Sequence, residues 1–314
     1  MAEAQKILID MDIGDDIDDA IALVAAMKQG FDIIGITTVF RNAAERARMT
    51  KKLLRAFGNG YENVPVYAGH GVPYGMPQTT YGHTPHYTAD LDDPAYTPDA
   101  TDPEAATDFI IRACQTYGKQ LTVIAIGPFT NMARVIEKDP DALNCAARVA
   151  IMGGAYLKQY ADWNVMCDVP AADILFRNAD NLECIGADVT HRMVATETLY
   201  ERLMHYRGSE PAQRYLCELC NLWRADRPEA ALVLHDPLVI HYVADPAVCR
   251  MKKAPIVVLT EGFAKGMTLN VDAYTKKYLN EDAYLGTDTA KKTLFACDVD
   301  KELFDARISE DFSE

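Results

Sequence analysis

Short runs of apolar and β-branched residues alternate with longer amphipathic stretches over the first two thirds of the chain. This spacing predicts strands at residues 7–10, 33–39, 65–68, 121–126, 149–152 and 183–187. It predicts helices between them, at residues 17–29, 43–57, 103–117, 130–138 and 170–177. Such alternation is typical of right-handed βαβ crossovers, which build a mainly parallel sheet covered by helices on both faces. We therefore predict an α/β fold.

The pattern changes after residue 196. Helical periodicity continues through residue 242, and β-rich stretches follow at residues 256–260, 267–271 and 293–298. We find no internal repeat, low-complexity tract or linker, so we expect one large domain over residues 1–314. The segment 69–101 is rich in Gly, Pro, Tyr, Thr and His and has no apolar period. A loop of this length in a compact domain is often an active-site lid, which is our prediction here.

Composition narrows the class of protein. The chain has 31 Lys and Arg against 46 Asp and Glu, a net charge of −15, which argues against nucleic acid as a partner. No run approaches the roughly 18 apolar residues of a membrane-spanning helix, and the first six residues carry no signal-peptide core. Eight dispersed cysteines are typical of reduced thiols, so we expect a cytoplasmic protein. Cys217 and Cys220 have CxxC spacing, but without a second such pair buried thiols are the simpler interpretation than a metal or redox site.

A cluster of acids follows the first predicted strand. Six aspartates fall within ten residues: Asp10, Asp12, Asp15, Asp16, Asp18 and Asp19. In open α/β sheets, ligands bind beyond the carboxyl ends of the strands. These carboxylates would repel one another unless a cation lay among them, and Ca²⁺ takes roughly six to eight oxygen ligands. Helix capping would account for Asp15 or Asp16 but not for Asp10 and Asp12, so we predict a divalent-metal site.

Another acid lies far downstream, in His235-Asp236-Pro237, at the start of a predicted helix. Taken alone, a His beside an Asp at this place is typical of a packed helix N-terminus. A catalytic interpretation of His235 and Asp236 depends on the other motifs in the sequence.

Several short motifs occur in a characteristic order. They are Asp10-x-Asp12-x-Gly14-x-x-x-Asp18-Asp19-Ala20, Thr37-Thr38-Val39-x-x-Asn42, Gly127-Pro128-x-Thr130-Asn131, Met152-Gly153-Gly154, Asp162-Trp163-Asn164 with Asp168 and Ala171-Ala172, and His235-Asp236-Pro237. In this order the chain resembles the inosine-uridine preferring, calcium-dependent nucleoside hydrolases over essentially its whole length. The resemblance implies a single Rossmann-like α/β domain, a bound Ca²⁺ at the carboxyl end of the sheet, and a homodimer or homotetramer.

The resemblance also implies roles for individual residues. The family's metal ligands match the carboxylates of Asp12, Asp19 and Asp236 and the backbone carbonyl of Ile126. Its ribose contacts match Asp18, which would bind the 2′-hydroxyl, together with Asn42, Asp162 and Asn164.

The implied reaction is hydrolysis of the N-glycosidic bond of a ribonucleoside to free base and ribose. Its transition state resembles an oxocarbenium ion, so a carboxylate-rich pocket suits the positive charge that develops on the ribose. Ca²⁺ would hold the attacking water and the ribose hydroxyls. Asp12 would act as general base, and His235 would donate a proton or hydrogen bond to the leaving base.

The base would lie near the predicted lid and the helices of residues 196–243. Candidate base contacts are His83 and His86 in the lid and the aromatic side chains Tyr156, Trp163 and Trp223. We expect His191, which follows a strand, to be a buried structural histidine.

The sequence departs from the family pattern at four places. Asp15-Asp16 lengthens the first motif, Asp162 stands where Glu is common, none of His70, His83 and His86 matches the pattern around the family's lid histidine, and residues 155–161 lack the Asn that many members use at the ribose 5′ side. The last departure leaves a substrate modified at the 5′ position open.

Two other functions are compatible with parts of the pattern. A non-catalytic nucleoside- or ribose-binding protein could retain the metal. A strand ending in Asp10-x-Asp12 also resembles haloacid dehalogenase-like phosphatases, whose further motifs do not assemble here. The sequence does not distinguish purine from pyrimidine substrates.

Overall fold

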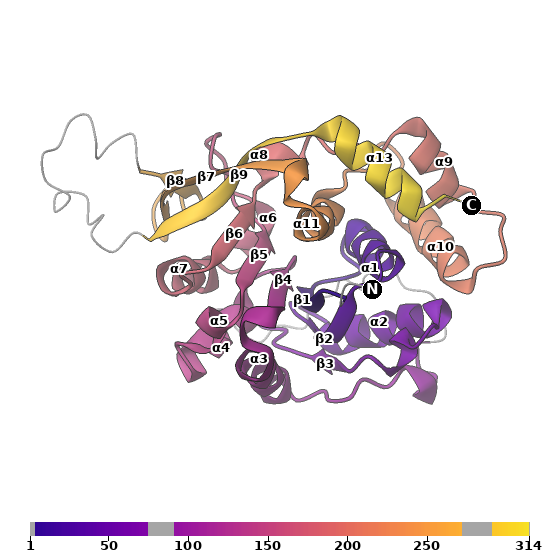
Figure 1. The fold of residues 1–314 in the computed structure, drawn as a ribbon, viewed down its shortest axis with the longest axis horizontal. Coiled ribbons are helices and arrows are strands. Elements are labelled where there is room, and N and C mark those ends of the chain that lie inside the picture. The colour runs from indigo at the N-terminus through magenta and orange to yellow at the C-terminus, as the bar shows by residue number, and fades with distance from the viewer. Residues whose placement is uncertain (1–3, 75–90, 272–290, 314) are drawn as a thin grey trace, which may run out of the picture.

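The computed structural model describes residues 4–74, 91–271 and 291–313. A nine-stranded sheet in the order β3-β2-β1-β4-β5-β6-β9-β7-β8 forms its centre (Figure 1). The strands are β1 (Lys6–Met11), β2 (Asp32–Thr38), β3 (Val66–Ala68), β4 (Leu121–Ala125), β5 (Arg148–Met152), β6 (Leu182–Ile185), β7 (Cys249–Val258), β8 (Thr268–Asn270) and β9 (Lys292–Val299). The pairings from β3 to β9 are parallel, and β7 pairs antiparallel with both β9 and β8. The predicted α/β class with a mainly parallel sheet is confirmed.

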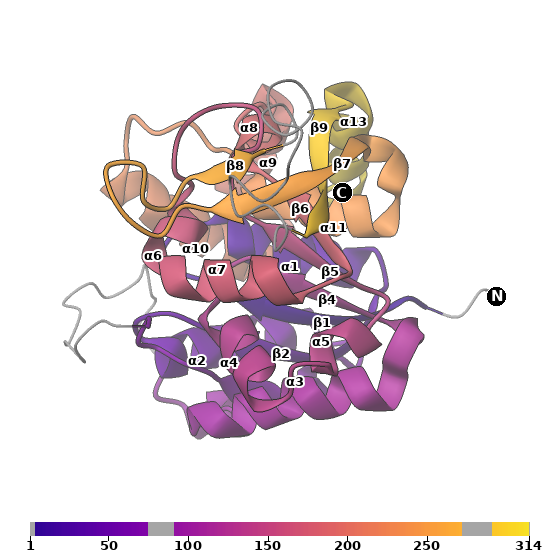
Figure 2. The same cartoon turned by 90° about the vertical axis from the view of Figure 1, so that its left-hand side faces the viewer.

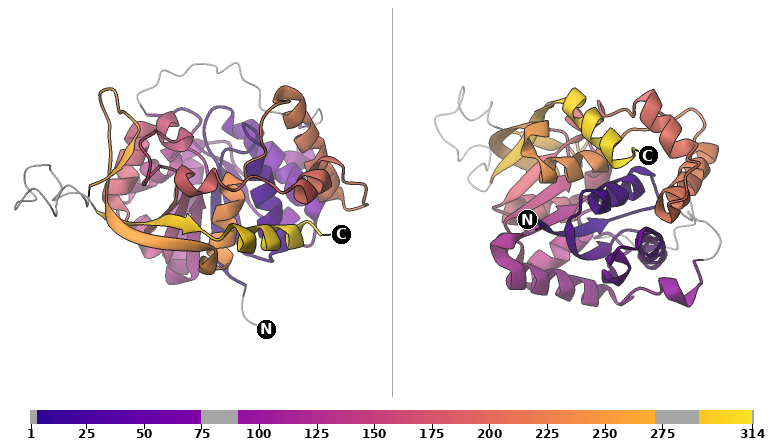
Figure 3. Two further views of the ribbon diagram at one scale, coloured as in Figure 1. Left: turned by 90° about the horizontal axis from the view of Figure 1, so that it is seen from above. Right: turned by 45° about the vertical axis from the view of Figure 1, so that its right-hand side comes forward.

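Helices cover both faces of the sheet. On one face lie α1 (Asp18–Lys28), α2 (Ala43–Phe57), α9 (Glu197–Met204), α10 (Pro211–Asp226), α11 (His235–Ala244) and α13 (Lys301–Asp311). On the other, which faces the viewer in Figure 2, lie α3 (Pro103–Tyr117), α4 (Thr130–Lys138), α5 (Ala142–Cys145) and α7 (Val169–Asn178). Two further short helices, α6 (Trp163–Cys167) and α8 (Ala187–Thr190), follow β5 and β6. Figure 3 shows α9 and α10 beyond α1 and α2, at the edge of the molecule.

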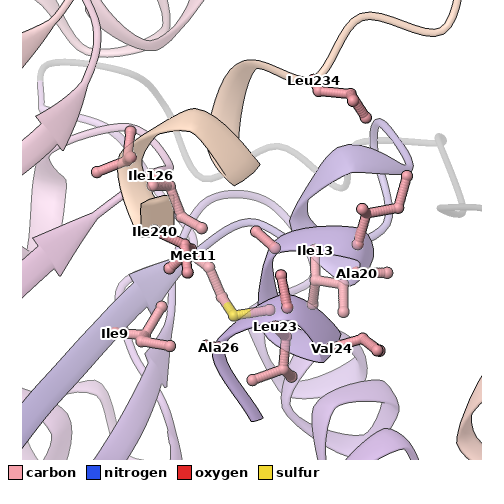
Figure 4. Packing of buried hydrophobic residues seen from close by; sticks show 14 of the residues in the cluster. Ile9, Met11, Ile13, Ala20, Leu23, Val24, Ala26, Ile126, Leu234 and Ile240 are labelled. Atoms are coloured by element: carbon pink, nitrogen blue, oxygen red, sulfur yellow. The ribbon is translucent and has the colours of Figure 1, made fainter. Parts of the chain in front are cut away.

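The continuous apolar character of α1 follows from burial on all sides. Residues 18–27 of this helix are buried, because α1 packs against α10, α11 and α13 and shares a hydrophobic core with β1. Figure 4 shows Leu23 of α1 near Met11 of β1 and Ile240 of α11. On β1, alternate side chains enter the two different cores, as expected for a strand covered on both faces.

The carboxyl-terminal part differs most from the sequence-based prediction. Strand β7 begins at residue 249, whereas the predicted strand began at residue 256. The prediction missed the first half of β7 because its exposed charged side chains do not form an apolar strand pattern. Strand β9 enters the sheet between β6 and β7, and the following helix α13 was not predicted. The predicted lid at 69–101 is described only at its two ends.

This topology places a crevice above the strands. The connections from β1 and β4 leave the sheet toward opposite faces, since α1 and α4 lie on different sides. Such a switch point, at the carboxyl ends of adjacent parallel strands, is where α/β folds bind ligands.

Candidate active site

A cavity of about 710 Å³ lies at the carboxyl ends of β1, β2, β4 and β5. The residues that line it are Asp12, Asp15, Asp16, Asp18, Asp19, Arg41, Ile126, Met152, Tyr160, Ala161, Asp162, Trp163, Asn164, Ala187, His191, Arg227, His235 and Asp236. They come from strand ends, loops and helix starts that are separate in the sequence and meet at this edge of the sheet. The volume is in the range of small-molecule binding sites.

Three buried carboxylates form the floor of the cavity. One oxygen from each of Asp18, Asp19 and Asp236 lies within 4.8 Å of the others. The Asp236 backbone N–H donates to Asp18 Oδ2 at 3.1 Å, which joins the start of α11 to the start of α1. The buried Asp19 Oδ1 accepts no hydrogen bond from the described residues.

Burial makes the ionised forms of these acids costly. It raises the pKa of Asp19 and Asp236 well above the ordinary value, and repulsion from the neighbouring aspartates raises them further. Burial likewise raises the pKa of Asp12 to about 7, although Arg46 opposes the shift. A set of buried oxygens with this excess of negative charge suits a hard divalent cation such as Ca²⁺.

Arg46 shapes the loop that carries the acids. This fully buried side chain on α2 donates through Nη1 to the Asp12 and Ile13 carbonyls, the second at 2.9 Å, and through Nε to the Phe40 carbonyl at 2.8 Å. Its Nη2 also pairs with Asp15 at 3.1 Å. The loop after β1 is therefore fastened to the end of β2.

The two extra aspartates of the motif form ion pairs. Asp15 pairs with Arg41 at 3.3 Å in addition to Arg46, and Asp16 pairs with Arg227 at 3.1 Å. Arg227 also donates to the Asp15 carbonyl at 2.8 Å, which connects the end of α10 with this loop. These contacts distinguish Asp15 and Asp16 from the three clustered carboxylates.

Asn164 and Asp162 form another wall. Asn164 Nδ2 donates to the carbonyls of Ile126 at 2.9 Å and Met152 at 3.1 Å, so it bridges the ends of β4 and β5. Asp162 caps α6 by accepting from Val165 N–H at 3.2 Å, and burial raises its pKa. Trp163, between them, is 59% exposed at the edge of the cavity.

His235 lies beside the acids at the start of α11. Its Nδ1 is 2.6 Å from Thr190 Oγ1, and its ring meets the ring of His191 edge-on at 5.2 Å. Burial, with a smaller effect from His191, lowers the pKa of His235 to about 4. The ring is therefore neutral near pH 7.

Most of the predicted site residues meet in the cavity. The structure brings together Asp12, Asp18, Asp19, Ile126, Asp162, Asn164, His235 and Asp236. Asn42 precedes α2 and does not line the cavity. His83 and His86 lie outside the described residues.

Three predictions about aromatic rings need correction. Tyr156 is buried against Phe295 and donates to the Gly153 carbonyl at 2.7 Å, and Trp223 is buried on the inner face of α10, so neither lines the cavity. His191, expected to be buried, is exposed and lines the cavity. Its ring stacks on Tyr160, whose hydroxyl is 3.2 Å from His191 Nδ1.

Sequence reasoning missed Arg41, Tyr160 and Arg227. Arg41 stands at an unspecified position of the motif Thr37-Thr38-Val39-x-x-Asn42, and the other two lie outside the motifs. The one local signal is structural: Phe40 and Arg41 both have positive φ, at 68° and 54°. Such a conformation in consecutive non-glycine residues is costly and typical of functional sites. It was not visible in the residue types.

The eight cysteines are free, and neither Cys217 nor Cys220 lines the cavity. Cys220 is buried, as expected, whereas Cys217 is only partly buried and donates to the Met204 carbonyl. None of the helices in the described residues is long and apolar enough to cross a membrane.

Comparison with known proteins gives a consistent result. The model of the family described as inosine-uridine preferring nucleoside hydrolase matches residues 7–306. A probable uridine nucleosidase 1 of Oryza sativa is 29% identical, over 90% of this chain and 89% of its own. An inosine-uridine preferring nucleoside hydrolase of Crithidia fasciculata is 29% identical, over 84% of this chain and 87% of its own. A plant nucleoside hydrolase structure superposes with a TM-score of 0.82 at 26% identity, covering 99% of both chains.

Proposed function

Since the chain belongs to the inosine-uridine preferring nucleoside hydrolase family and is an enzyme of the N-ribohydrolase class, we propose that its cavity hydrolyses ribonucleosides with the help of Ca²⁺. The observation that carries this proposal is the convergence of Asp12, Asp18, Asp19 and Asp236 with His235 in one cavity. Asp12, Asp18 and Asp19 are more than 200 positions away from His235 and Asp236 in the sequence. Carboxylates and a histidine are the residue types that the reaction requires.

The donor set fits calcium. Asp12, Asp19 and Asp236 would hold the ion with the Ile126 carbonyl, all of which are oxygen donors at the cavity. Asp18, in the same carboxylate cluster as Asp19 and Asp236, would then place the ribose 2′-hydroxyl beside the ion. Bound calcium would supply positive charge that makes an attacking water more acidic.

The chain's own groups perform the remaining steps. Asp12, whose carboxylate lines the cavity, accepts the proton of the attacking water. The surrounding carboxylates stabilise the positive charge that develops on the ribose as the glycosidic bond breaks. Asp162 and Asn164 bind ribose hydroxyls, Asn164 through the amide oxygen, since its Nδ2 donates to two carbonyls.

His235 assists departure of the base. Because its ring is neutral near pH 7, it acts as a hydrogen-bond donor to the leaving base rather than as a preformed imidazolium. His235 lies beside His191, whose ring stacks on Tyr160, and these rings support a base pocket at this end of the cavity.

The proposal is tested by release of free ribose from inosine, adenosine, guanosine, uridine and cytidine, with Ca²⁺ and after exhaustive chelation. We expect metal-dependent release from at least one of them. The 2′-deoxy form of the best substrate should react at least about 100-fold more slowly, because Asp18 loses its partner. A 5′-modified nucleoside belongs in the panel, since residues 155–161 lack the expected Asn. Absence of release by calcium-loaded protein would instead support a binding protein.

A further inference from the structure

The imidazole of His235 contacts two consecutive residues at the end of α8. Thr190, the last residue of α8, lies with its Oγ1 2.6 Å from His235 Nδ1. His191 follows and packs against the ring edge-on, with the ring planes at 75°. Thr190 has no exposed surface and does not line the cavity, whereas His235 does.

The burial of Thr190 decides the direction of this hydrogen bond. A buried hydroxyl needs an acceptor for its proton, and in the described part of the chain the only hydrogen bond of this hydroxyl is to His235 Nδ1. If Nδ1–H donated instead, the hydroxyl proton would remain buried without a partner. The hydroxyl therefore donates and Nδ1 accepts, so the proton of the neutral ring is on Nε2.

We propose that Thr190 is a positioning residue that fixes His235 in the Nε2–H tautomer, with the donor available to the leaving base. This inference rests on the proposed function, in which His235 donates to that base. A ring in the opposite tautomer would present a lone pair from Nε2 and could not stabilise negative charge on the base. Thr190 would thus affect the rate while touching no substrate.

The tautomer can be measured directly in the intact, calcium-loaded protein. Long-range ¹⁵N–¹H correlation spectra at pH 7.5, with the His235 signals assigned by comparison with a His235→Gln variant, report which ring nitrogen is protonated. We expect protonated Nε2 and unprotonated Nδ1. Protonated Nδ1 would overturn the inference, and this measurement does not depend on any Thr190 variant folding.

Kinetics provide the second test. Thr190→Val removes the hydroxyl at nearly constant volume, and Thr190→Ser keeps it. With the best nucleoside, we expect Thr190→Val to lower kcat about 100-fold with little change in KM, and Thr190→Ser to retain most of the rate. With p-nitrophenyl riboside, whose leaving group departs without a proton donor, Thr190→Val should stay within about threefold of the unmodified enzyme. Equal losses on both substrates, or no loss on the nucleoside, would contradict the inference.

A matched control lies elsewhere in the molecule. Thr107 is also buried, its Oγ1 is 3.1 Å from His70 Nε2, and neither residue lines the cavity. Thr107→Val should leave the ratio of the two rates unchanged.

His235→Ala separates the two claims. If it slows the nucleoside alone while Thr190→Val does not, only the inference about Thr190 fails. If His235→Ala slows neither substrate, the proposed role of His235 fails, and the inference falls with it.

Discussion

The six aspartates between the end of β1 and the start of α1 are close in the sequence but have different partners. Asp10 accepts from Thr37 at 2.5 Å and Asn131 at 2.7 Å, while Asp15 and Asp16 are paired with arginines. Asp18 and Asp19 make no ion pair with Arg or Lys in the described residues and lie against Asp236. Asp10, Asp15 and Asp16 therefore hold this acidic segment in place, while Asp18 and Asp19 belong to the candidate metal site.

Asp12 has the most demanding role in this account. Asp12→Asn keeps the size of the side chain but removes the base, so kcat should fall at least about 100-fold in steady-state ribose release. The matched control is Asp245→Asn, whose carboxylate pairs with Arg307 away from the cavity and whose loss should leave kcat within about twofold. A kcat close to that of the unmodified enzyme in Asp12→Asn would exclude this residue as the base.

Calcium affinity should depend on pH. Metal ligands must be ionised, and burial raises the pKa of Asp12 to about 7 and those of Asp19 and Asp236 above their ordinary values. Protons therefore compete more strongly with Ca²⁺ for these carboxylates as the pH falls. We expect weaker binding at pH 6 than at pH 8 and release of protons on binding, measured by titration calorimetry in buffers of different ionisation enthalpy. Equal affinity at both pH values would contradict this.

Residue types predicted part of the site and missed the rest for a physical reason. A metal site was recognisable because so many acids directly after a strand exceed what helix capping requires, whereas the separate roles of Asp12, Asp18 and Asp19 came from the resemblance to a family. Arg41 and His191 were not recognisable, since whether such a side chain faces a cavity depends on φ angles and tertiary packing that the sequence does not display. Trp223 shows the converse, because an aromatic ring on an amphipathic helix also suits the core.

At the scale of elements, the four-residue helix α8 organises two sides of the cavity. Thr190 contacts His235, and the buried Asp188 accepts from the backbone N–H groups of Tyr156, Leu157 at 3.2 Å and Lys158 at 2.9 Å. The loop after β5 that carries Tyr160 is thereby tied to α8. The sequence pattern predicted the strand before α8, but the predicted strand ran to residue 187. It therefore overlapped the first residue of α8, and the helix was not predicted.

Removal of the Asp188 carboxylate should loosen that loop. We expect Asp188→Ala to lower the free energy of unfolding by about 2–3 kcal/mol, because it removes the acceptors of three backbone N–H groups, one of them on the buried Tyr156. Urea denaturation measures the loss, and hydrogen exchange should accelerate at residues 156–158. Asp188→Asn, which keeps one acceptor oxygen, should have a smaller effect. Unchanged exchange at these amides would show that the loop is held by other contacts.

At the scale of the whole molecule, periodicity predicted the parallel part of the sheet but not the complete strand order. The placement of β9 between β6 and β7 depends on pairing between residues more than 100 positions apart, such as Cys184 with Phe295. The residues close to each strand in the sequence do not indicate such a long-range pairing. The expected homodimer or homotetramer stays a prediction, which sedimentation velocity would test.

The metal-free protein should lose stability as the pH rises. Burial raises the pKa of Asp10 and of Asp12 from 3.8 to about 7, so the folded state binds these protons more tightly than the unfolded state. Their stabilising contribution is complete below about pH 4 and is lost as the pH rises through about 7. Between pH 5.5 and 8, Tm measured by calorimetry in a chelator should fall by about 5 °C or more. Added Ca²⁺ should reduce the fall, and a rising Tm in chelator would contradict the assignment.

The central claim is that the carboxylate cavity hydrolyses a ribonucleoside only with calcium in place. The most direct measurement titrates Ca²⁺ into exhaustively chelated protein and follows, in the same sample, bound calcium and ribose release from the best nucleoside. We expect one ion per chain at the site, with activity rising in proportion to its occupancy, and neither tight binding nor activity in Asp236→Asn. Full ribose release from the chelated protein, or a filled calcium site without activity on any ribonucleoside, would contradict it.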